Sequence, residues 1–175
     1  MYRGNAIAAH AEAAQARATQ LNRPLVVIGD PDAGMHTRLM RAYGCGSICV
    51  DLLGCPGCPV SIPVDITRGR VSRVPDNSAI VYCSCVLEYV TDPAAAWAEI
   101  LRMAGDPSNV FIVSVQPGTL TSALYPGARF MISHAPGAAQ ISARPVTTLR
   151  KVVYGTSLTA LTAAALKPLG ITKLL

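Results

Sequence analysis

Hydrophobic and polar positions form blocks along the chain that predict helices and strands in alternation. Residues 5–20 are rich in Ala with scattered polar side chains and predict a helix, which Asn22-Arg23-Pro24 ends. The apolar run Leu25-Val26-Val27-Ile28 lies between Pro24 and Gly29 and predicts a strand buried on both faces. Residues 35–43 predict a second helix and residues 47–52 a second strand. A strand, turn, helix and strand within about 30 residues are typical of a βαβ unit in a parallel sheet.

The second half of the chain continues this alternation. Asp92-Pro93 predicts the start of a helix that runs to about residue 104, because Asp is a favoured cap and Pro fits the first turn. The remaining predictions are strands at 64–66, 79–83, 109–115, 128–133 and 147–153 and a last helix at 156–166. Because no repeat or low-complexity linker divides the chain, residues 1–175 are predicted to form one α/β domain with a mostly parallel sheet.

Four segments in this order resemble the class I S-adenosylmethionine-dependent methyltransferases. They are residues 25–34 (LVVIGDPDAG), 49–51 (CVD), 74–93 (VPDNSAIVYCSCVLEYVTDP) and 98–102 (AEILR). Residues 24–117 contain all four, and 118–175 diverge. The resemblance implies a Rossmann-like, mostly parallel sheet with flanking helices, reduced in size. It also implies S-adenosylmethionine as cofactor and methyl transfer to an unknown acceptor.

The resemblance further implies which residues bind the cofactor. Small residues after the first strand let the backbone approach a ligand, and an acid after the second strand can accept hydrogen bonds from ribose hydroxyls. No universal catalytic residue is implied, because methyl transfer depends mostly on positioning. The implied cofactor-binding residues are Gly29, Asp30, Gly34, Asp51, Ser84, Cys85 and Glu88.

Departures from the family pattern support a second hypothesis. The family usually has three closely spaced glycines after the first strand, whereas Pro31 and Ala33 stand between Gly29 and Gly34 here. The connection after Asp51 leaves little room for a crossover helix. The alternative is therefore a non-catalytic methyltransferase-like protein that serves as a structural or interaction module.

Composition and charge narrow the class of protein. Hydrophobic residues make up 51% and charged residues 14% of the 175, which excludes an ordinary disordered chain. No apolar stretch predicts a membrane span, and charges throughout the first residues argue against a secretory signal, so we expect a cytoplasmic protein.

The net charge of +5 is unevenly distributed. Residues 1–106 carry nine Arg and ten acidic residues, whereas 107–175 carry six basic residues and no acid. The basic, apolar segment 118–175 predicts an anionic or protein partner, and leaves self-association open. The alternative is that this segment only completes the fold.

Six cysteines lie at positions 45, 49, 55, 58, 83 and 85. Because no secretory signal is recognisable, we expect reduced thiols rather than disulfides. Cys55 and Cys58 could hold zinc together with Cys83 and Cys85, but the second pair lacks the spacing of a zinc-binding turn. The sequence therefore favours buried, inert thiols and predicts no metal site.

Overall fold

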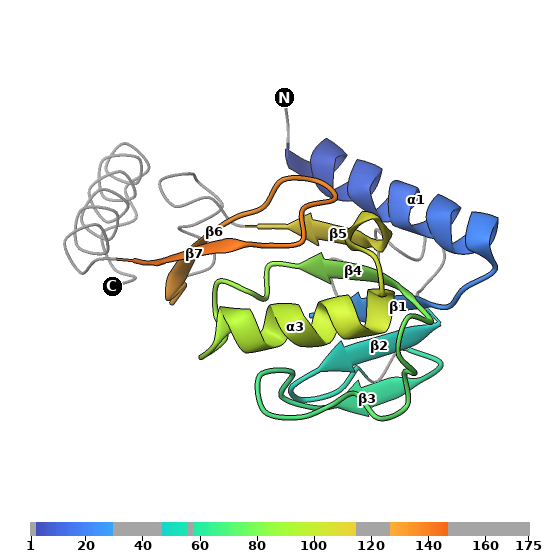
Figure 1. The fold of residues 1–175 in the computed structure, drawn as a ribbon, viewed down its shortest axis with the longest axis horizontal. Coiled ribbons are helices and arrows are strands. Elements are labelled where there is room, and N and C mark those ends of the chain that lie inside the picture. The colour runs from blue at the N-terminus through green and yellow to red at the C-terminus, as the bar shows by residue number, and fades with distance from the viewer. Residues whose placement is uncertain (1–2, 30–46, 56–57, 115–126, 147–175) are drawn as a thin grey trace, which may run out of the picture.

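The computed structural model describes residues 3–29, 47–55, 58–114 and 127–146, which form an α/β fold (Figure 1). In this described part, five parallel strands form the main sheet in the order β3-β2-β1-β4-β5. They are β1 (Leu25–Ile28), β2 (Ile48–Asp51), β3 (Ser61–Pro63), β4 (Ile80–Ser84) and β5 (Val110–Val113). This strand order is consistent with a Rossmann-like fold, and the predicted parallel sheet is confirmed.

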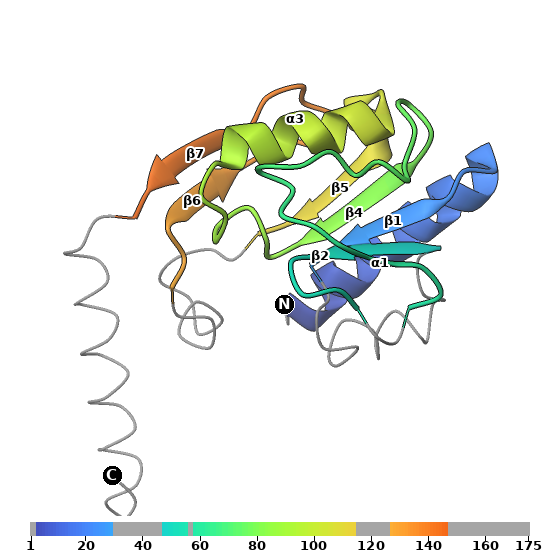
Figure 2. The ribbon, with the colours of Figure 1, turned by 90° about the horizontal axis from the view of Figure 1, so that it is seen from below.

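Helices cover both faces of this sheet (Figures 1 and 2). On β1, Leu25 and Val27 belong to the core beneath α1 (Arg3–Leu21), whereas Val26 and Ile28 belong to the core beneath α3 (Pro93–Ala104). Burial on both faces explains why all four residues of β1 are apolar. No helix in the described residues has the length and apolar character needed to cross a membrane.

The predicted helix after Asp92 is confirmed together with its cap. The Asp92 carboxylate accepts hydrogen bonds from the N–H groups of Ala94 and Ala95, each at 3.0 Å. These bonds satisfy donors that a helix start leaves without an internal partner. A short 3₁₀ helix, η1 (Pro107–Asn109), then leads into β5.

One predicted strand is misplaced, and one strand of the structure was not predicted. The prediction of a strand at 64–66 is wrong: β3 comes earlier and pairs with β2 through residues 61–63. The Asp65 side chain accepts hydrogen bonds from Thr67 and so forms a turn that ends the extended backbone. The strand β7 (Ser142–Pro145) was not predicted, whereas the strand at 147–153 and the helices at 35–43 and 156–166 fall outside the described residues.

A hairpin of β6 (Phe130–Ser133) and β7 packs against α3. The Trp97 indole N–H donates to the Ala139 carbonyl at 2.9 Å, and its ring lies edge-on to His134 with centroids 5.0 Å apart. The main-chain oxygen of Glu88 accepts hydrogen bonds from the N–H groups of Arg129 and Phe130. These contacts attach the hairpin to the main sheet through α3 and the segment after β4.

Arg102 on α3 anchors the segment between β3 and β4. Its guanidinium forms two hydrogen bonds with Glu99, at 2.7 and 2.8 Å, and donates to the carbonyl oxygens of Val71 and Val74. It also pairs with Asp76, which in turn pairs with Arg70. Burial alone would raise the pKa of Glu99, but hydrogen bonds from Arg102 and from the Val71 N–H hold that pKa below its usual range.

This anchoring predicts a loss of stability in acid. The pKa of Glu99 is lower in the folded than in the unfolded protein. Between these two pKa values the unfolded state therefore binds more protons than the folded state, and lowering the pH favours unfolding. We therefore expect the stabilisation to be complete above about pH 5 and to decline below it. Urea unfolding at several pH values should show a shallower acid decline for Glu99→Gln than for the wild type. An equal decline in both proteins would contradict this role of Glu99.

Candidate functional site

A cavity of about 400 Å³ opens at the carboxyl ends of β1, β2 and β4. The strand order reverses between β1 and β4, and ligands of open α/β sheets bind in the crevice at such a switch point. The volume lies within the range of small-molecule sites. The described residues that line the cavity are 28–29, 50–52, 64–66, 85–86, 89–91 and 129.

Gly29 allows two walls of the cavity to approach each other closely. Its φ is +84°, and its N–H donates to the Val50 carbonyl at 3.0 Å. A Cβ at this position would lie 2.0 Å from Cγ2 of Val86 and 3.2 Å from the Ser84 carbonyl oxygen. Only glycine combines this backbone conformation with this approach, so the predicted site residue has a clear structural requirement.

Asp51 ends β2 and carries a half-buried carboxylate at the cavity. Its Oδ1 accepts a hydrogen bond from the Leu53 N–H at 3.0 Å, which fixes the start of the connection to β3. Among the described residues, no hydrogen bond engages Oδ2 of Asp51. One oxygen of a well-oriented carboxylate is therefore available to a ligand.

The residues after β4 have different positions relative to the cavity. Cys85 lines it and has a φ of +54°, which is uncommon for a residue with a side chain and is held by a hydrogen bond from its N–H to the Val113 carbonyl. Ser84 and Glu88 are 3% and 1% exposed and are not among the described lining residues. Burial raises the pKa of the adjacent Cys83 thiol, and the charge of Glu88 adds to this effect.

The structure thus brings Gly29, Asp51 and Cys85 together at one cavity and places Ser84 and Glu88 in the interior. Asp30 and Gly34, the other predicted cofactor-binding residues, lie outside the described residues.

Two charged lining residues were missed by the sequence analysis. Asp65 follows β3, and its carboxylate accepts hydrogen bonds from the N–H and hydroxyl of Thr67, which lower its pKa. The rule that ligands bind at the carboxyl ends of strands could have identified it, had β3 been placed correctly. Arg129 reaches the cavity only because its main chain bonds to Glu88, and no local pattern indicates this long-range contact.

Comparisons with protein-family models, curated proteins and solved structures find no match for this chain.

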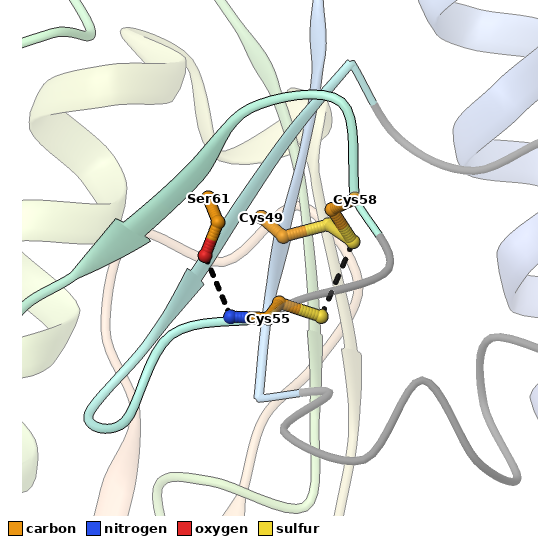
Figure 3. Close-up of a disulfide and its surroundings, with 4 residues drawn as sticks. All are labelled: Cys49, Cys55, Cys58 and Ser61. Carbon is orange, nitrogen blue, oxygen red and sulfur yellow. Dashed lines mark hydrogen bonds between the residues drawn. A yellow bond between two sulfur atoms is a disulfide. The ribbon is translucent and has the colours of Figure 1, made fainter.

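A group of three cysteines, Cys49, Cys55 and Cys58, belongs to the core beneath α1 (Figure 3). The expectation that all cysteines are reduced is wrong, because Cys49 and Cys58 form a disulfide with their Cα atoms 6.2 Å apart. The short connection from β2 to β3 turns back along β2 and brings Cys58 beside Cys49. Cys83 instead belongs to the core beneath α3, so the structure does not join the Cys55/Cys58 and Cys83/Cys85 pairs.

Proposed function

We propose that this chain binds S-adenosylmethionine in the cavity at the switch point and transfers its methyl group to an acceptor. The observation that carries the proposal is the convergence of Gly29, Asp51 and Cys85, which the resemblance assigns to the cofactor, on one cavity. These residues come from three strand ends that are well separated in the sequence. A resemblance in short segments does not by itself require them to meet at a single site.

The chemistry of the lining residues fits the cofactor. Oδ2 of Asp51 can accept from ribose hydroxyls, and the apolar side chains of Val64 and Ile66 offer a wall for the adenine ring. The guanidinium of Arg129 carries the charge that a methionine carboxylate requires. When bound, the cofactor supplies an activated methyl group on its sulfonium. The protein contributes orientation and exclusion of water.

Asp51→Asn provides a sharp test of this assignment. An asparagine oxygen can still accept from the Leu53 N–H, so the turn should persist, but the negative charge and the second acceptor oxygen are lost. We expect the affinity for S-adenosylmethionine to fall at least about tenfold, as for loss of a hydrogen bond to a charged group. Isothermal titration calorimetry measures the effect directly.

A matched control lies at the amino ends of the strands, on the side of the sheet away from the cavity. Asp106 precedes the amino end of β5 and also accepts a hydrogen bond from an N–H two residues on, that of Ser108. Asp106→Asn should leave the affinity unchanged. Absence of both heat and thermal shift with millimolar S-adenosylmethionine, or with its demethylated product, would refute cofactor binding. The non-catalytic interaction module would then be the better hypothesis.

A further inference from the structure

Three cysteine sulfurs converge at the connection between β2 and β3. The Sγ atoms of Cys49, Cys55 and Cys58 lie within 4.8 Å of one another, and that of Cys55 is 3.2 Å from that of Cys58 (Figure 3). Thiolates around a tetrahedral zinc ion, with Zn–S bonds of about 2.3 Å, are about 3.8 Å apart. This value lies between the Cys55–Cys58 distance of 3.2 Å and the upper limit of 4.8 Å for the cluster. None of the three cysteines lines the cavity described above.

The backbone holds these three residues together independently of their sulfurs. The Cys55 N–H donates to the Ser61 hydroxyl at 2.6 Å, and the Cys58 N–H donates to the Cys55 carbonyl at 3.1 Å. Cys49 is fixed by the parallel pairing of β2 with β3. Because these bonds do not use the sulfur atoms, opening the disulfide should leave three thiols side by side.

The type of ligand indicates the ion. Cys49 and Cys55 are buried and Cys58 is half-buried. Thiolates select soft or borderline ions such as Zn²⁺ over Mg²⁺ or Ca²⁺. Because zinc takes four ligands in a tetrahedron, three thiolates would leave the fourth position to water or a further ligand.

We propose that the reduced protein binds one Zn²⁺ through the thiolates of Cys49, Cys55 and Cys58. A dithiol gives two electrons and its two thiol protons to the Cys49–Cys58 disulfide and becomes a disulfide itself. A phosphine gives two electrons and takes up the oxygen of one water molecule to become a phosphine oxide, and that water supplies the two protons. The two cysteines become thiols, and the thiol protons pass to solvent as the ion binds. The disulfide uses two of the three ligands, so disulfide and metal exclude each other and the site is controlled by redox state.

Metal titration of the full chain tests this proposal. The protein is stripped of metal, reduced with a phosphine without oxygen, and titrated with Zn²⁺ against a chromophoric chelator. Cd²⁺ is then titrated to detect thiolate-to-metal charge-transfer absorption. We expect one equivalent of either ion to bind to the reduced wild type, and neither ion to bind to the disulfide form. Cys55→Ser should weaken zinc binding by more than about 100-fold. Replacing a residue that only hydrogen-bonds to a metal ligand typically weakens metal binding about 10- to 100-fold, and loss of the ligand itself should have a larger effect.

Control variants separate ligand loss from other effects. Cys85→Ser removes a thiol outside the cluster and should bind zinc like the wild type. Melting temperatures measured before metal is added establish that Cys55→Ser is folded, and Cys58→Ser, at a half-buried position, provides a second variant. The proposal is overturned if the reduced wild type takes up no ion, or if Cys55→Ser binds as tightly as the wild type. Peptide mapping that finds a Cys55–Cys58 disulfide in a protein that binds no metal would indicate thiol–disulfide exchange instead.

Discussion

Replacing Arg102 by alanine is expected to lower the free energy of unfolding by about 2–4 kcal/mol. The Arg102 side chain is only 17% exposed, and its paired Glu99 is 12% exposed. Without the guanidinium, the largely buried Glu99 carboxylate loses two of its three hydrogen bonds in the described structure, and the carbonyl oxygens of Val71 and Val74 lose a donor. Most of the lost free energy of unfolding comes from these polar groups, which remain buried after losing hydrogen-bond partners. Urea unfolding followed by circular dichroism measures it.

An exposed arginine provides the comparison. Like Arg102, Arg68 pairs with an acidic residue three positions earlier, but its side chain is 78% exposed and the distance to Asp65 is 3.6 Å. Exposed pairs of this kind contribute about 0–1 kcal/mol, so Arg68→Ala should have little effect. Similar small losses for Arg68→Ala and Arg102→Ala would mean that Arg102 does not anchor the segment before β4.

The sequence predicted the parts of the fold whose side chains are buried in a regular pattern. Residues 25–28 are apolar because both faces of β1 are covered, and Asp92 is a cap that acts within its own turn. The strands β3 and β7 lack such signals. β3 ends on Pro63 and pairs with β2 as its only neighbour among the described strands, and every residue of β7 is exposed. Where the side chains of a strand are not packed against a core, they need not be apolar, so the pattern of hydrophobic residues in the sequence does not locate the strand.

The same distinction applies to the two candidate sites. Gly29 and Asp51 follow strands that could be recognised, so the rule for carboxyl ends of parallel strands applies to them. Arg129 depends on a hairpin attached through main-chain bonds to Glu88, which no local sequence pattern indicates. The disulfide was missed for another reason. An argument from cellular compartment gives no information about distance, whereas the short β2–β3 connection sets the Cα separation of Cys49 and Cys58.

Replacing Gly29 is expected to affect both the stability of the fold and the proposed cofactor binding. Gly29→Ala should lower the free energy of unfolding by about 2–4 kcal/mol, from the cost of a positive φ and from overpacking. The added Cβ would meet Cγ2 of Val86 at 2.0 Å, and Val86 is a short, β-branched side chain with little freedom to move aside. Because both residues line the cavity, displacement of Val86 should also weaken S-adenosylmethionine binding at least about tenfold.

Three further variants, Gly137→Ala, Val86→Ala and the double variant Gly29→Ala/Val86→Ala, distinguish the clash from the backbone cost. Gly137 also has a positive φ, of +74°, but a Cβ there would meet nothing within 4 Å, so Gly137→Ala should lose only about 1 kcal/mol. Adding Val86→Ala to Gly29→Ala removes the clashing methyl groups, and the double variant should recover stability relative to the sum of the single changes. Denaturant unfolding and calorimetry on the wild type and the four variants measure both effects. If the losses are purely additive, the wall formed by Val86 is not what requires glycine at this strand end.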